Sequence, residues 1–98
     1  MPILAMLELD GDTEALLDAG ADLERRLGTP DGLLVRLVAP TETGIVLFQL
    51  WASAAARQRN ADDPGHRDAL AASGLTALVT GTRSRAFDET TLQLVAAG

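Results

Sequence analysis

The chain has 98 residues, of which 47% are hydrophobic, and this length predicts one domain, residues 1–98, with no room for a second. Fourteen acidic side chains outnumber eight basic ones, all arginines, and the net charge of -6 argues against nucleic acid as a partner because it repels phosphate backbones. The sequence has no cysteine, no apolar stretch near the roughly 20 residues that span a bilayer and no signal-peptide pattern, so we expect a cytoplasmic protein without disulfides or membrane contact.

The first 30 residues predict a strand followed by a helix. Residues Ile3 to Leu9 alternate between two faces, which is typical of a strand. Asp12 follows a turn and is placed to cap a helix that runs to about Leu27, with an apolar stripe at a 3.6-residue period. The opposite side of this helix is charged and is expected to face water; it carries Asp18, Asp22, Glu24, Arg25 and Arg26.

Two strands joined by a short turn are predicted in the middle of the chain. Residues 33–39 and 45–51 are rich in β-prone side chains, and the segment 41–44 between them is a hairpin connection. These strands are therefore expected to be antiparallel neighbours.

The second half of the chain predicts a broken helix and a last strand. Ser53 is a plausible N-cap for a helix from Ala54, which residues 62–65 interrupt and which resumes from His66 to about Ser73. Residues 75–84 have an ambiguous pattern. The last strand is expected within residues 85–95, with apolar anchors at Phe87, Leu92 and Leu94.

This order of elements predicts an α+β fold of the ferredoxin-like, split βαβ type (β-α-β-β-α-β). A four-stranded antiparallel sheet would carry both helices on one face. Because the chain supplies no helix for the other face, a second copy is the simplest cover, and we expect a homodimer.

Strand parity predicts two different sheet faces. One face is wholly apolar and consists of Ile3, Ala5, Leu7, Leu33, Val35, Leu37, Val46, Phe48 and Leu50. The other face includes Glu8, Arg36, Gln49 and Trp51 among the apolar side chains of Leu4, Met6, Leu34, Ile45 and Leu47. Buried polar groups need partners or water, so these four residues are predicted to bind a substrate in a pocket beneath the helices. The alternative is a dry core with an Arg36–Glu8 ion pair.

The second helix supplies the predicted catalytic residues. Arg57 and Asn60 are three positions apart and so share a side of the helix, which either borders a cavity above the sheet or faces solvent. His66 is the only histidine, and histidine is the residue type suited to proton transfer near neutral pH. The candidate catalytic set is therefore His66, Arg57 and Asn60, with a solvent-exposed histidine as the alternative.

Two other chemistries have less support from the residues. Asp62, Asp63, His66 and Asp68 include metal-ligating types, but their spacing fits no established site, and neither a metal nor another cofactor is predicted. Pro2 raises the possibility of a tautomerase that uses an N-terminal proline amine as base. That chemistry requires the removal of Met1, and the rest of the sequence does not resemble that family.

Three segments resemble a known family: Pro30-Asp31-Gly32-Leu33-Leu34, Ala39-Pro40-Thr41-Glu42-Thr43-Gly44 and Leu50-Trp51-Ala52-Ser53. The chain is similar to the small bacterial dimeric α+β barrel proteins grouped with the antibiotic biosynthesis monooxygenases. The resemblance implies paired ferredoxin-like subunits, each with a cleft between sheet and helices. In the oxygenase members an Asn, a Trp and a His line that cleft. Here Trp51 lies at a comparable strand end, whereas Asn60 and His66 lie on the second helix.

Two functional hypotheses follow. The first is an enzyme of secondary metabolism that acts on a small aromatic or polyketide-like hydrophobic substrate, as a cofactor-independent monooxygenase or a cyclase. Trp51 would shape the pocket, and Arg57 and Arg36 would stabilise an enolate or phenolate oxygen. The second is a dimeric ligand-binding or scaffold domain without catalysis. An open cleft with His66 or Asn60 in its wall would favour the enzyme.

Overall fold

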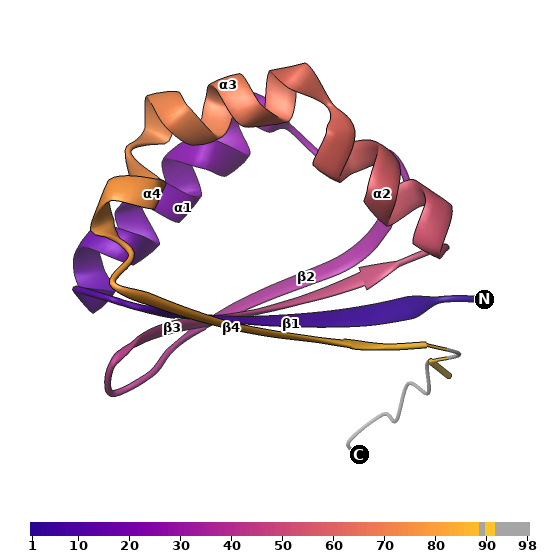
Figure 1. The fold of residues 1–98 in the computed structure, drawn as a ribbon, viewed down its shortest axis with the longest axis horizontal. Coiled ribbons are helices and arrows are strands. Elements are labelled where there is room, and N and C mark those ends of the chain that lie inside the picture. The colour runs from indigo at the N-terminus through magenta and orange to yellow at the C-terminus, as the bar shows by residue number, and fades with distance from the viewer. Residues whose placement is uncertain (89, 92–98) are drawn as a thin grey trace, which may run out of the picture.

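The computed structural model describes residues 1–88, 90 and 91. Its elements are β1 (Ile3–Asp10), α1 (Thr13–Leu27), β2 (Leu33–Pro40), β3 (Gly44–Trp51), α2 (Ala54–Asp62), α3 (Pro64–Ser73), α4 (Leu75–Leu78) and β4 (Gly81–Phe87). All four helices lie on the same side of the sheet (Figure 1). None of the described helices is long and apolar enough to cross a membrane.

The four strands form one antiparallel sheet in the order β2-β3-β1-β4. The central strand β1 is joined to the outer strand β2 through α1, and the central strand β3 is joined to the outer strand β4 through α2, α3 and α4. This arrangement confirms the predicted ferredoxin-like α+β fold and the β2–β3 hairpin.

The helix boundaries follow from local capping chemistry. The Asp12 carboxylate accepts a hydrogen bond from the Ala15 N–H at 2.9 Å, and the Ser53 hydroxyl accepts one from Ala56 at 3.1 Å, so both predicted N-caps are confirmed. Asp63 caps α3, with Pro64 at its first position. Gly74 ends α3 in the left-handed conformation, at φ 75°.

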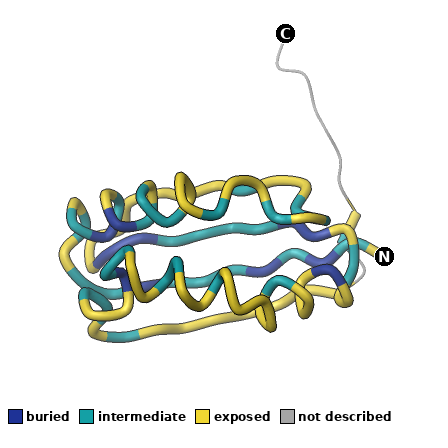
Figure 2. Tube along the Cα trace, turned by 90° about the horizontal axis from the view of Figure 1, so that it is seen from above, coloured by how far each residue is buried: buried dark blue, intermediate teal, exposed yellow. Residues whose placement is uncertain are grey.

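The core lies between the central strands and the helices. Leu16 on α1 is fully buried against Leu9, Ile45 and Leu75. A second, smaller cluster is formed by Ala5, Trp51 and Ala56, with Leu33 packed against it. Figure 2 shows that buried positions gather along the inner strands, whereas the outer sides of the helices are exposed.

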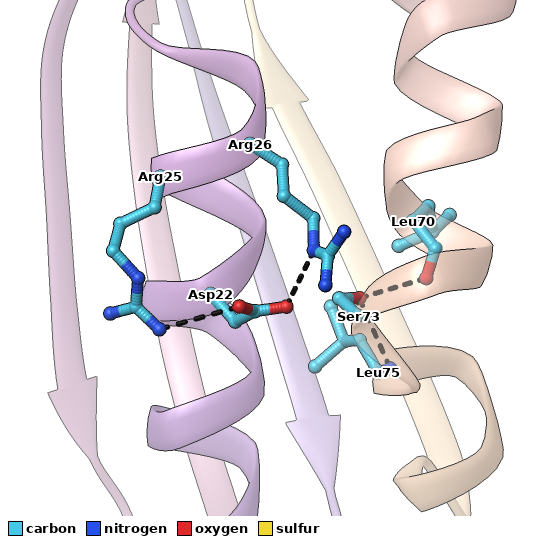
Figure 3. Close-up of polar contacts among 6 residues, drawn as sticks. All are labelled: Asp22, Arg25, Arg26, Leu70, Ser73 and Leu75. Carbon is cyan, nitrogen blue, oxygen red and sulfur yellow. Dashed lines mark hydrogen bonds and ion pairs between the residues drawn. The ribbon is translucent and has the colours of Figure 1, made fainter.

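Hydrogen bonds and ion pairs lie along the surface of α1 and at the junction of α3 with α4 (Figure 3). Asp22 pairs with Arg26 at 2.7 Å and Arg25 at 3.4 Å along the exposed side of α1. At the junction the Ser73 hydroxyl donates to the Leu70 carbonyl at 2.8 Å and accepts from the Leu75 N–H at 3.2 Å. These bonds satisfy backbone groups where α3 ends and the chain turns back toward the sheet.

The predicted sorting of the sheet faces is wrong for β1. Ile3 lies opposite Trp51 and Ala5 opposite Gln49, so the odd-numbered residues of β1 face the helices. Glu8 therefore points to the face that the helices leave bare, away from the predicted pocket. The alternative of an Arg36–Glu8 ion pair is also wrong, because Arg36 pairs with Glu24 and Glu8 pairs with Arg83.

The prediction for Leu33 is also wrong, because a register irregularity lies between Leu33 and Val35. Leu33 lies opposite Trp51 and packs against it on the helix side of the sheet. Val35 lies opposite Leu50 on the bare side, as expected, and Leu34 between them is 54% exposed. Strict alternation cannot anticipate an irregularity of this kind.

The last strand begins earlier than predicted. β4 spans Gly81–Phe87, so it begins in the segment whose pattern is ambiguous and ends in the segment predicted to hold the strand. It is an edge strand whose residues are almost all exposed, so it lacks the apolar alternation by which strands are read. Of the predicted anchors, Phe87 ends β4, while Leu92 and Leu94 lie outside the described residues. Beyond β4, Thr90 still bonds to β1, because its hydroxyl accepts from the Leu4 N–H at 3.2 Å.

Candidate functional site

Arg36, Gln49 and Trp51 form a contiguous group on the helix side of the sheet. Arg36 lies opposite Gln49 across the β2–β3 hairpin, and Trp51 follows Gln49 two residues along β3. Two residues along a strand are about 7 Å apart and share a face. The hairpin thus brings together three of the four residues predicted to bind a substrate.

Trp51 is the most enclosed member of this group. Its side chain is 1% exposed and packs against Ala5, Ala56 and Leu33. Its indole N–H is buried and has no hydrogen-bond acceptor. A buried donor without a partner costs about 1 to 3 kcal/mol, so this nitrogen is a point at which a bound oxygen atom would stabilise the complex.

Arg36 carries a second buried donor without a partner. Its terminal nitrogen Nη1 donates to Glu24 on α1 at 2.8 Å, while its Nε–H is buried and has no acceptor. The Arg36 side chain is only 18% exposed. Among the described residues, the Arg36 Nε and the Trp51 Nε1 are the buried side-chain polar atoms without a partner. Both are donors, so the site is suited to oxygen acceptors.

Two hollows border Arg36 and Glu24 between α1 and β2. One, of about 290 Å³, is lined by Glu24, Gly28, Thr29, Pro30, Leu33, Leu34, Val35 and Arg36. The other, of about 240 Å³, is lined by Leu17, Gly20, Ala21, Glu24, Arg36, Val38 and Leu47. We call these two hollows together the α1–β2 groove.

Asn60 and His66 lie on the inward sides of their helices. Asn60 is one helical turn beyond Ala56, which touches Trp51, and it is half-buried. His66 is half-buried and one turn before Leu70, which packs against the core. Neither residue lines the two hollows beside Arg36, and the catalytic role of both stays a prediction.

Arg57 does not join this group. It is exposed and borders a different hollow, of about 330 Å³, together with Ile3 on β1 and Ala86 on β4. Of the two alternatives for the Arg57 side of the helix, a cavity shared with Arg36 is not what the structure shows: α2 turns Arg57 toward the β1–β4 side of the sheet, whereas Arg36 lies on β2.

Glu8 belongs to an ion cluster on the bare face of the sheet. Arg83 donates to Glu8 at 2.8 Å and to the two oxygens of Asp10 at 2.9 and 3.1 Å. The bonds from Arg83, and then from Thr43, lower the pKa of Asp10. This cluster ties β4 to β1 and lies away from Arg36 and Trp51.

Glu24 contacts the site but was not predicted to do so, because its position on the helix predicts a solvent-facing side chain. Only the fold shows that Arg36 points toward α1 and needs a partner there. The other acidic residues near His66 do not converge, and the described part of the chain holds no group of three His, Asp or Glu side chains placed to bind a metal ion.

Comparison with known proteins identifies the fold. No family model and no curated protein matches the sequence. Among solved structures, a candidate antibiotic biosynthesis monooxygenase from Chloroflexus aurantiacus J-10-fl superimposes with a TM-score of 0.71 at 15% identity, covering 100% of this chain and 98% of that one. SnoaB, a cofactor-independent oxygenase from Streptomyces nogalater, gives 0.69 at 17% identity, covering 98% and 96%. A dimeric ferredoxin-like protein of unknown function from Jannaschia sp. CCS1 gives 0.70 at 15% identity, covering 90% and 99%.

These structural neighbours are antibiotic biosynthesis monooxygenase-like and dimeric ferredoxin-like proteins, which agrees with the resemblance noted in the sequence. At such low identities the agreement establishes the shared fold.

Proposed function

We propose that the chain is a homodimeric enzyme that binds a small, oxygenated hydrophobic molecule between its sheet and helices and acts as a cofactor-independent monooxygenase. The observation that carries this proposal is the pair of buried, unpartnered donors, the Arg36 Nε–H and the Trp51 indole N–H, on one face of the sheet. Such donors stabilise an oxygen atom on which negative charge develops. SnoaB, which shares the fold, is a cofactor-independent oxygenase, and this supports the general kind of chemistry.

The reaction requires no external reductant. A phenol or enol loses a proton and becomes an electron-rich anion that can react with O₂. A methylene carbon of the substrate then loses two hydrogens and gains one oxygen atom, while the second oxygen atom leaves as water with those hydrogens. The substrate supplies all four electrons, so the protein has to supply a base and donors that stabilise the anion.

We assign the base to His66 and a positioning role to Asn60. Both are half-buried on the inward sides of α3 and α2, and histidine is suited to accept a proton near neutral pH. Gln49, between Arg36 and Trp51 on the sheet, would orient the substrate by hydrogen bonds. A cyclase would use the same base and the same donors, without O₂.

The homodimer part of the proposal is supported by the bare face of the sheet. Leu37 is 60% exposed there, and Val35 and Phe87 are each 38% exposed. A hollow of about 450 Å³ on this face is lined by Leu4, Val35, Leu37, Phe48, Leu50, Thr90 and Thr91. Contiguous apolar surface of this kind marks interfaces, and a second copy of the same sheet would cover it.

One observation favours a binding domain without catalysis as the second candidate. Trp51 is 1% exposed and packed on several sides, so a substrate can reach its N–H only if α2 moves. A domain that opens in this way could bind a hydrophobic molecule without transforming it.

The first prediction tests the Trp51 N–H directly. Trp51 is the only tryptophan, so its indole N–H gives one isolated NMR signal. Titration of the full chain with polycyclic phenols should move that signal downfield, and O₂ uptake should persist in the presence of a chelator. Trp51→Phe keeps an aromatic ring but removes the donor, and it should lower kcat at least tenfold. Binding without O₂ uptake or cyclised product would support the second candidate, and an unmoved indole signal would refute the site.

A further inference from the structure

The Arg36–Glu24 ion pair joins β2 to α1, two elements that otherwise leave a gap between them. α1 packs chiefly against α3, α4 and β3. Val38 on β2, on the helix side of the outer strand, remains 43% exposed. The ion pair at 2.8 Å crosses this gap in the middle of the α1–β2 groove and borders both of its hollows.

The hydrogen bonding of Arg36 is incomplete in a specific way. Glu24 accepts one bond, from Nη1, and leaves the buried Nε–H without an acceptor. A guanidinium is a planar fork that binds a two-oxygen anion through two parallel bonds, and such pairs are stronger than single bonds. Glu24 occupies Nη1 alone, so a ligand with two coplanar oxygens could replace it by binding Nη1 and Nη2 together.

Glu24 is suited to being displaced from Arg36 by a competing anion. Its side chain is 49% exposed, and ion pairs at this degree of exposure are weak because water and salt compete with them. Displaced from Arg36, its carboxylate would remain hydrated at the surface of α1.

The walls of the groove determine the rest of the ligand. Beside Arg36 they are formed by Leu17, Val38 and Leu47, which suit an apolar body. Gly20 lies in the middle of α1, where glycine disfavours the helix, and nothing stands within 4 Å of the position that its Cβ would occupy. The missing side chain leaves room for a flat ring.

We infer that the α1–β2 groove admits a small aromatic carboxylate or an enolised β-dicarbonyl compound, whose two oxygens replace Glu24 on Arg36. Glu24 is then a displaceable counter-ion that selects for planar two-oxygen anions. The inference rests on the proposed function in one respect: it names the substrate class and the entrance of the same site.

The test uses two probes of the same shape, 2-naphthoate and its neutral analogue 2-naphthamide. NMR titration of the full chain should show tighter binding of naphthoate and a shift of the Arg36 side-chain N–H signals. Glu24→Gln should tighten naphthoate binding roughly two- to fivefold, because the competing carboxylate is gone, and should leave naphthamide unchanged. Glu42→Gln removes the same charge from the exposed β2–β3 turn and should change neither affinity.

A second variant tests the shape of the groove without changing any charge. Gly20→Leu should fill the hollow between Leu17 and Val38 and abolish binding of both probes, while α1 gains helix propensity and the fold remains intact. Equal affinity for the two probes, equal effects of Glu24→Gln and Glu42→Gln, or undiminished binding by Gly20→Leu would each overturn the inference.

The outcomes also separate this inference from the proposed function. Naphthoate could shift the Trp51 indole signal equally, and bind with the same affinity, in the wild type and in Glu24→Gln. That result would support the proposed site and refute the role of Glu24. If the Arg36 signals shift with naphthoate and Glu24→Gln tightens binding as expected, the ligand site in the groove is supported. If phenols at the same time cause neither a Trp51 shift nor O₂ uptake, the proposed enzyme is refuted.

Discussion

Gly32 sets the spacing between the sheet and α2 at the site. It lies just before β2 at φ 85°, and a Cβ on it would stand 2.5 Å from the Cβ of Ala56. Ala56 in turn packs against Trp51. One glycine therefore permits the close packing that encloses the Trp51 indole.

Gly32→Ala should destabilise the chain by about 2 to 4 kcal/mol, because a strained backbone and a steric clash add together. The variant should also shift Trp51 fluorescence to longer wavelength as α2 moves off the ring. Gly28→Ala is the matched control, since Gly28 has φ 66° but open space around its Cβ position, and it should cost only about 1 kcal/mol. Urea unfolding followed by fluorescence measures both effects. Equal losses would show that the contact with Ala56 is unimportant.

At the scale of elements, the hairpin explains which parts of the site could be predicted from sequence. β2 and β3 are joined by a short turn, so their register is nearly determined by the chain itself. Arg36, Gln49 and Trp51 could therefore be placed on one face. β1 is connected through α1, and its register with β3 depends on side-chain packing that no local pattern shows. Apart from Glu8 and Asp10 near its end, β1 is apolar on both faces, so the wrong parity was equally consistent with the sequence.

The helices were predictable where caps and breaks mark them, at Asp12, Ser53 and Gly74. β4 was not, because an exposed edge strand made of Thr, Arg and Ser lacks an apolar stripe. The pairing of Glu24 with Arg36 joins residues that are separated by the end of α1 and a loop. Such a contact follows from tertiary structure and not from spacing along one helix.

The attachment of β4 to β1 gives a prediction about pH. Arg83 holds the pKa of Asp10 below its ordinary value of 3.8, so the pairing stabilises the fold above that pH and the contribution is lost as the pH falls through the lowered pKa. Arg83→Gln should raise the pKa of Asp10 in an NMR titration. The stability difference from the wild type should be full at neutral pH and shrink below pH 3.8.

Arg85→Gln is the matched control for this prediction. Arg85 lies on the same face of β4, over the Phe87 ring at 4.7 Å, and its loss removes the same charge. The pKa of Asp10 should change less in this variant than in Arg83→Gln. An equal change in both would mean that the overall charge, and not the hydrogen bonds from Arg83, lowers the pKa.

At the scale of the whole molecule, the two sides of the sheet differ in how they are covered. The helix layer buries one side, and the described residues place no helix on the other, where apolar side chains stay exposed beside the Arg83 cluster (Figure 1). A chain of 98 residues buries a smaller fraction of its surface than a larger one does. Self-association through this face would bury the exposed apolar side chains.

Leu37→Arg should therefore convert a dimer into a monomer, because it places a charge within the exposed apolar surface of this face, and sedimentation equilibrium should report half the mass. Val38→Arg tests the specificity of this effect: Val38 is the next residue of β2, is 43% exposed and faces the helix side. That variant should remain dimeric. Alternate residues of a strand point to opposite faces, so dissociation by both substitutions would indicate an interface at the edge of β2. A monomeric wild type would refute the sheet-to-sheet dimer.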